Sequence, residues 1–65
     1  MLLMEDRVGE VLKRYPYLDE IFYMFTDNPD LVFDDADYSL RDFAEMVGAD
    51  IEELLRDLQK KIDAR

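Results

Sequence analysis

The sequence predicts an all-α protein, a compact bundle of four short helices in a single helical domain over residues 1–65. Three observations predict this fold. Apolar residues recur every three or four positions in four separate segments, which is the spacing of one helix face. Residues that favour helix starts and ends lie at the borders of these segments. No segment alternates polar and apolar residues as a half-buried strand does. We expect the helices at about residues 6–15, 16–25, 39–47 and 50–63, with an acidic loop at 26–38.

One apolar stripe defines the first helix. Its members are Val8, Val11, Leu12 and Tyr15. Either Asp6 or Arg7 is expected at the start of this helix, and Asp6 is the better N-cap candidate, since its carboxylate can accept hydrogen bonds from the first backbone N–H groups. Gly9 lowers the stability of a short helix by up to ~1 kcal/mol relative to alanine, so its presence predicts the close approach of another helix.

The second helix begins at Pro16, because the residue before a proline disfavours helical dihedrals and proline itself suits a first helical turn. Large apolar residues cover almost its whole circumference. They are Leu18, Ile21, Phe22 and Phe25 on the main stripe, and Tyr17, Tyr23 and Met24 beside it. Such a helix is either enclosed by its neighbours or presents an apolar face to a partner.

The segment 26–38 is expected to be a loop, because "TDNPD" is a turn signal and Pro29 cannot continue a helix. We expect Phe33 to hold the middle of this loop against the protein and Tyr38 to hold its end. The loop contains five aspartates, namely Asp27, Asp30, Asp34, Asp35 and Asp37. Their carboxylates are ligands that calcium prefers, but the central glycine and closing glutamate of an EF-hand loop are missing. We therefore expect a solvated acidic loop and no metal site.

The last two helices carry the clearest local signals. Ser39 precedes Asp42 in the capping spacing, and Gly48 is expected to end that helix in the left-handed conformation. Asp50 and Glu53 repeat the capping spacing at the start of the final helix. The apolar stripes are Leu40, Phe43, Ala44 and Val47, then Ile51, Leu54, Leu55, Leu58 and Ile62. The two helices therefore fold back on each other or cross sharply.

The net charge of −9 comes from 17 acidic and 8 basic residues and repels phosphate backbones and anionic lipid head groups. We expect neither nucleic acid nor membrane as a partner. The chain has no cysteine and no histidine, which excludes disulfides, thiol redox chemistry and the commonest metal ligand and general base. The opening "MLLM" lacks the basic start and long apolar run of a secretory signal. A cytoplasmic location is the expectation.

Two segments, "VGEVLKRYPYLDEIF" at 8–22 and "SLRDFAEMVGADIEELLRDLQ" at 39–59, resemble a small helical domain of unknown function from bacteria and archaea. That domain occurs alone or at the N-terminus of longer proteins, some with PAS or hemerythrin-like modules. It is also similar to the N-terminal domain of iron–sulfur-cluster repair proteins. This chain fits either a complete protein or the N-terminal domain of a longer one.

Many members of this family carry a Cys-x-Gly-Cys-like pair after the second helix and are described as redox-disulfide domains associated with hybrid-cluster proteins. This sequence has "TDNPDLVFDDADY" in the same region. Aspartate and asparagine cannot replace a dithiol in electron transfer. The resemblance therefore does not carry the redox role to this chain.

We expect an uncharacterised, non-enzymatic module without a cofactor, which binds another protein or its own copy, as in a homodimer. The candidate interaction surface consists of Tyr17, Tyr23, Met24, Phe25 and Phe33, because tyrosine and methionine are enriched at interface centres. The alternative is a metal- or redox-accessory domain descended from cysteine-bearing relatives, with the acidic loop as a weak cation site. A small hydrolase is the third hypothesis, although Ser39 is better placed as a cap than as a nucleophile.

Overall fold

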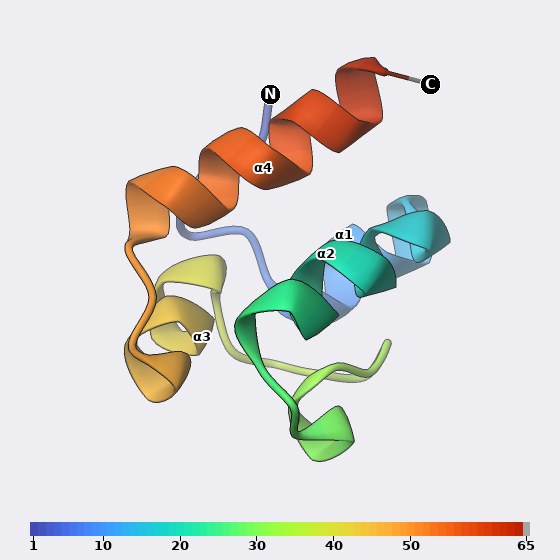
Figure 1. Cartoon of the computed structure of the whole chain (residues 1–65). Coiled ribbons are helices and arrows are strands. Elements are labelled where there is room, and N and C mark those ends of the chain that lie inside the picture. Colours follow the sequence, from blue (N-terminus) through green and yellow to red (C-terminus); the bar gives the residue numbers. More distant parts are fainter. Residues whose placement is uncertain (65) are drawn as a thin grey trace.

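The computed structural model describes residues 1–64, which form a compact all-α globule without strands (Figure 1). All four expected helices are present, and the acidic stretch between the second and third is a loop. The elements are α1 Val8–Arg14, η1 Pro16–Leu18, α2 Asp19–Phe25, η2 Pro29–Leu31, α3 Leu40–Val47 and α4 Ile51–Asp63, where η marks a short 3₁₀ helix. The expected second helix therefore begins as a 3₁₀ turn and continues as α2.

The borders of α3 and α4 follow the predicted signals. The Ser39 hydroxyl accepts a hydrogen bond from the Asp42 N–H at 3.0 Å, and Gly48 ends α3 with φ of 72°. The Asp50 carboxylate accepts a hydrogen bond from the Glu52 N–H at 2.9 Å, one residue earlier than the predicted partner. These contacts satisfy backbone groups that have no partner inside a helix.

The core lies where the inner faces of the helices meet. The rings of Phe22 from α2 and Phe43 from α3 stand edge to face, with centroids 5.1 Å apart, a favoured aromatic geometry. Around them lie the fully buried Val8, Leu18, Leu40, Leu54 and Leu58. The longest helix, α4, runs along one side of the molecule with the N-terminus beside it (Figure 1).

Residues 1–7, the N-terminal arm, are paired with the end of the acidic loop and the start of α3. The Leu40 N–H donates to the Asp6 carbonyl at 2.9 Å, and the Arg41 N–H donates to the Met4 carbonyl at 3.0 Å. Leu2 is almost fully buried, and its N–H donates to the Gln59 side chain at 3.0 Å. The arm thus joins the start of the chain to both α3 and α4.

The prediction that Asp6 is the N-cap of the first helix is wrong. Arg7 occupies the N-cap position of α1, and no side chain caps it. The Asp6 carboxylate accepts a hydrogen bond from the Leu3 N–H instead. A cap is not needed, because the N–H groups of Val8 and Gly9 donate to the carbonyls of the loop at 2.9 Å each.

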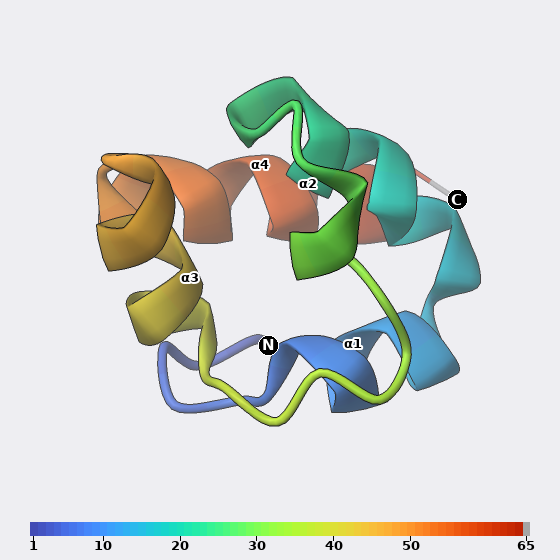
Figure 2. The same cartoon turned by 90° about the horizontal axis from the view of Figure 1, so that it is seen from below.

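The close contact predicted at Gly9 exists, but its partner is the backbone of the acidic loop and not another helix. A Cβ atom at this position would lie 2.6 Å from the Ala36 carbonyl oxygen and 2.8 Å from the Asp34 carbonyl oxygen. Figure 2 shows this part of the loop running beside α1. Glycine is required here because any side chain would collide with two backbone atoms.

Candidate interaction surface

The acidic loop is packed against the protein by residues other than those predicted. Val32 and Ala36 are 7% and 3% exposed and belong to the core, whereas Phe33 is 43% exposed. The prediction that Phe33 holds the middle of the loop is therefore wrong. The hydrogen bond from the Gly9 N–H to Ala36 sets the position of the backbone, and this position turns Val32 and Ala36 inward.

The end of the loop is held by Tyr38, as predicted. Its half-buried hydroxyl donates a hydrogen bond to the Leu31 carbonyl, and burial raises the pKa of this hydroxyl. Arg7 donates to the Asp37 carbonyl and lies 3.4 Å from the Asp37 carboxylate. The first contact closes the loop on itself, and the second connects it at the surface to the start of α1.

Replacing Tyr38 with phenylalanine is expected to reduce the free energy of unfolding by about 1 kcal/mol at pH 7, because the Leu31 carbonyl loses its donor. The raised pKa means that the folded state holds the hydroxyl proton more tightly than the unfolded state, where the pKa is 10.0. The stabilisation is complete below pH 10 and decreases as the pH rises through the folded-state pKa. Urea unfolding of both proteins between pH 7 and 11 measures this difference.

The exposed Tyr23 provides the matched control. Tyr23→Phe is expected to leave the free energy of unfolding at pH 7 unchanged. Equal pH dependence in the Tyr38→Phe variant and the unmodified protein would contradict the role given to the Tyr38 hydroxyl.

The loop aspartates are spread along the surface. Within residues 1–64, no three acidic side chains come together as a set of metal ligands. Asp37 is the one loop aspartate in an ion pair within this part of the chain, and its partner is Arg7. The structure therefore gives no ligand cluster for the cation site that the sequence left as an alternative.

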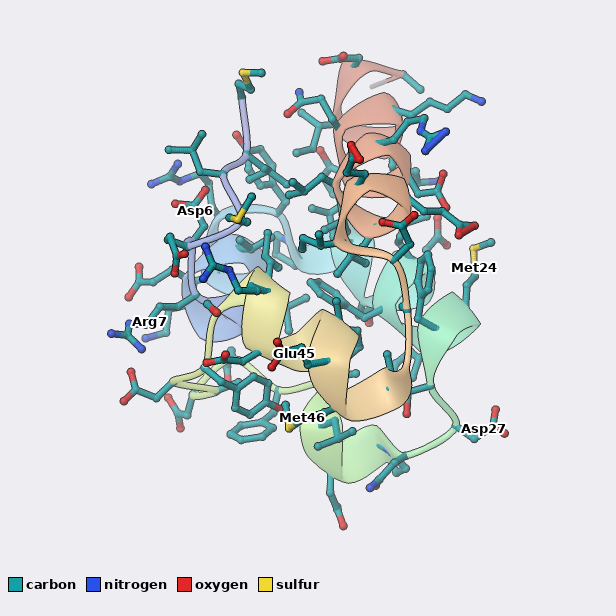
Figure 3. All side chains as sticks on the ribbon, turned by 90° about the vertical axis from the view of Figure 1, so that its left-hand side faces the viewer. Asp6, Arg7, Met24, Asp27, Glu45 and Met46 are labelled. Atoms are coloured by element: carbon teal, nitrogen blue, oxygen red, sulfur yellow. The ribbon has the colours of Figure 1, made fainter. Side chains whose placement is uncertain are left out.

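The predicted interaction residues fall into three groups. Tyr17 and Phe25 are half-buried and pack against the core. Tyr23 and Met24 are 44% and 72% exposed on α2, and Met24 projects from the side of the molecule opposite Arg7 (Figure 3). Phe33 stands edge to face with Tyr38 at 6.4 Å. Of the five candidates, Tyr23 and Met24 thus form the exposed apolar pair on one helix.

Met24 also lines a shallow groove between α2 and the C-terminal half of α4, with a volume of about 280 Å³. Its lining residues are Ile21, Met24, Asp57, Lys60, Lys61 and Ala64. The Lys61 ammonium forms an ion pair with Glu20. We call this site the α2–α4 groove.

The groove residues from the end of α4 and its C-cap were not predicted to belong to a functional site. Asp57, Lys60, Lys61 and Ala64 are spaced three, one and three positions apart, so they share one helix face. This face is polar and lies beside the apolar stripe of α4, and this position is the only sign of the groove in the sequence. Without knowledge of the tertiary fold, such a polar face is interpreted as a solvent-exposed helix surface.

Two other hollows are present in residues 1–64. One, of about 250 Å³, lies between the N-terminal arm and α1, and is lined by Glu5, Asp6 and Glu10 together with Arg7, Arg14 and apolar residues. The other, of about 140 Å³, lies between α1 and the acidic loop. Both have mixed or acidic linings, whereas the α2–α4 groove combines apolar residues with two lysines.

Comparison with known protein families, with curated proteins and with solved structures finds no match for this chain. The family resemblance noted in the sequence therefore stays an expectation. No helix within residues 1–64 is long and apolar enough to cross a membrane.

Proposed function

We propose that this chain is a non-enzymatic protein-interaction module that binds its partner through the outer face of α2. The observation that carries the proposal is the exposure of Tyr23 and Met24, at 44% and 72%, on neighbouring positions of one short helix. Tyrosine and methionine are enriched in the centres of protein interfaces. Met24 also lines the α2–α4 groove, so its side chain lies at the edge of a hollow that can receive a partner side chain.

The size of the hollows favours binding of a protein over turnover of a small substrate. The α2–α4 groove has a volume of about 280 Å³, which is at the lower limit of the ~300–1,000 Å³ of typical small-molecule sites. A groove of this size fits one or two side chains of a partner, as interface anchors do. The proposal includes a cytoplasmic location and descent from the family of small helical domains, as a member without cysteines.

Native mass spectrometry of the protein, purified from its own cells at low salt, tests the proposal. We expect a discrete additional mass, either a second copy or another protein. Tyr23→Asp is expected to abolish this association, because a buried aspartate without a partner is costly at an interface. The variant is expected to stay folded, since substitution of exposed residues changes stability by about 0.5 kcal/mol or less.

Met24→Asp and Met46→Asp form a matched pair for the same experiment. Both methionines are exposed, at 72% and 50%, but Met46 lies on α3 and outside the α2–α4 groove. We expect Met24→Asp to remove the associated mass and Met46→Asp to keep it. Loss of the associated mass in both variants would refute the use of α2 as the binding face. So would a monomer without any associated protein, even after cross-linking in cells.

A further inference from the structure

The shape of the α2–α4 groove indicates the form of its occupant. The α4 residues that line it extend from Asp57 to Ala64, which corresponds to two helical turns and about 10 Å. Opposite them, Ile21 and Met24 are three positions apart on α2, and Ile21 packs against the core. A groove between two helices with an apolar wall is suited to a partner helix with apolar side chains at every third or fourth position.

The charge of the groove differs from that of the protein as a whole. The net charge is −9, and the chain contains only three lysines, of which two line this groove. Lys61 is paired with Glu20. Lys60 is exposed, and no ion pair within residues 1–64 involves its ammonium group. Asp57 is the one acidic lining residue, and it lies one turn before the lysines.

We infer that the α2–α4 groove binds an acidic amphipathic segment of another protein. This inference rests on the proposed function and names the class of partner. An apolar side chain of the segment contacts Ile21 and Met24, and a carboxylate one turn along contacts Lys60. Glu20 competes with the segment for Lys61, because it already forms an ion pair with that lysine.

The probe is a synthetic 16-residue amphipathic peptide with leucine at every third or fourth position and glutamate on the other face. A matched peptide carries lysine in place of each glutamate. Titration of the ¹⁵N-labelled protein with each peptide, followed by NMR, locates the contact and measures the affinity. At about 0.15 M ionic strength, where the field of the net charge of −9 is screened beyond about 8 Å, we expect the acidic peptide to shift the amide signals of α2 and of residues 57–64. We expect it to bind about tenfold more tightly than the basic peptide, or better.

Three variants separate the charge effect from general binding. Lys60→Glu is expected to weaken binding of the acidic peptide about tenfold, a difference of about 1.4 kcal/mol, and Lys60→Gln about threefold. Glu20→Gln is expected to strengthen binding, because it releases Lys61. Lys13→Glu, at an exposed lysine on α1, changes the net charge equally and is expected to leave the affinity within about twofold. Circular dichroism of each variant confirms that it is folded.

Several results would overturn the inference. One is equal affinity for the acidic and basic peptides, or no binding of the acidic peptide. Another is an equal loss of affinity in Lys60→Glu and Lys13→Glu. A third is that the amide signals shift only for residues outside the groove. Tight binding of a second copy, seen as a doubled mass that Met24→Asp removes, would assign the groove to self-association instead. The Met24→Asp mass experiment judges the proposed function separately. If Met24→Asp abolishes binding of the partner and Lys60→Glu does not weaken it, the proposed function is retained and the inference of an acidic segment is rejected.

Discussion

Replacing Phe22 with alanine is expected to unfold about half of the protein or more at 25 °C. Phe22 is fully buried and its ring meets that of Phe43 at 5.1 Å. Truncation of a buried phenylalanine costs about 3–5 kcal/mol, because it removes apolar burial and leaves a cavity. A core in a domain of this size supplies only about 3–5 kcal/mol in total. The loss is therefore expected to match the whole free energy of unfolding, and helical circular dichroism at 222 nm measures it.

The neighbouring Tyr23 gives the control for this experiment. Tyr23→Ala removes an aromatic ring from the next position of α2, but that ring is 44% exposed, so the variant is expected to remain folded. Phe22→Leu keeps most of the buried volume and is expected to stay folded with reduced stability. Cooperative thermal unfolding of Phe22→Ala near the melting temperature of the unmodified protein would show that the core tolerates the cavity.

Replacing Gly9 with alanine is expected to lower the free energy of unfolding by about 2 kcal/mol. The added Cβ would lie 2.6 Å from the Ala36 carbonyl oxygen, and backbone atoms cannot move aside as the end of a long side chain can. Overpacking costs about 1–3 kcal/mol, and the better helix propensity of alanine returns up to ~1 kcal/mol. Urea unfolding measures the net effect.

Gly48→Ala separates steric collision from backbone strain. Gly48 has φ of 72°, and nothing lies within 4 Å of the place of its Cβ. Its substitution is expected to cost about 1–2 kcal/mol through the left-handed conformation alone. For Gly9→Ala, we also expect faster hydrogen exchange at the Val8 and Gly9 amides, which donate to the loop. Unchanged exchange and unchanged stability in this variant would mean that the loop moves away from α1 at little cost.

The helices of this protein could be predicted from sequence because their signals are local. Ser39, Gly48 and Asp50 each act on backbone groups within a few positions, so α3 and α4 begin and end where these residues predict. The apolar stripes set which side of each helix faces inward. Such signals do not depend on which other segments lie nearby, and they need only the 3.6-residue period and the chemistry of caps.

The errors concern contacts between distant residues. Asp6 was expected to cap α1, but the carbonyls of Ala36 and Tyr38, about thirty positions away, accept the hydrogen bonds of its first turn. Phe33 was expected to hold the middle of the loop against the protein. The smaller Ala36 does so instead, because it lies where the loop touches Gly9. Side-chain size does not determine direction in a loop whose backbone is positioned by a partner far along the chain.

The exposure of the candidate interaction residues could be predicted only in part, because it also depends on contacts between distant residues. The surplus of apolar residues on α2 showed that some had to be exposed, and the structure selects Tyr23 and Met24. Periodicity alone could not make this selection, because it depends on which neighbours cover α2. The contribution of Lys60 and Lys61 requires that the end of α4 lies beside α2, as the ion pair from Lys61 to Glu20 shows.

The pairing of the N-terminal arm with residues 36–41 sets an order on the folding of the chain. The arm cannot complete its backbone hydrogen bonds before the start of α3 is in place, because its partners are the amides of Leu40 and Arg41. The contacts between α3 and α4 are closer in sequence and have a smaller loop-closure cost. We therefore expect the hydrogen bonds between the N-terminal arm and the start of α3, which span more than thirty positions, to form later in folding than the contacts between α3 and α4.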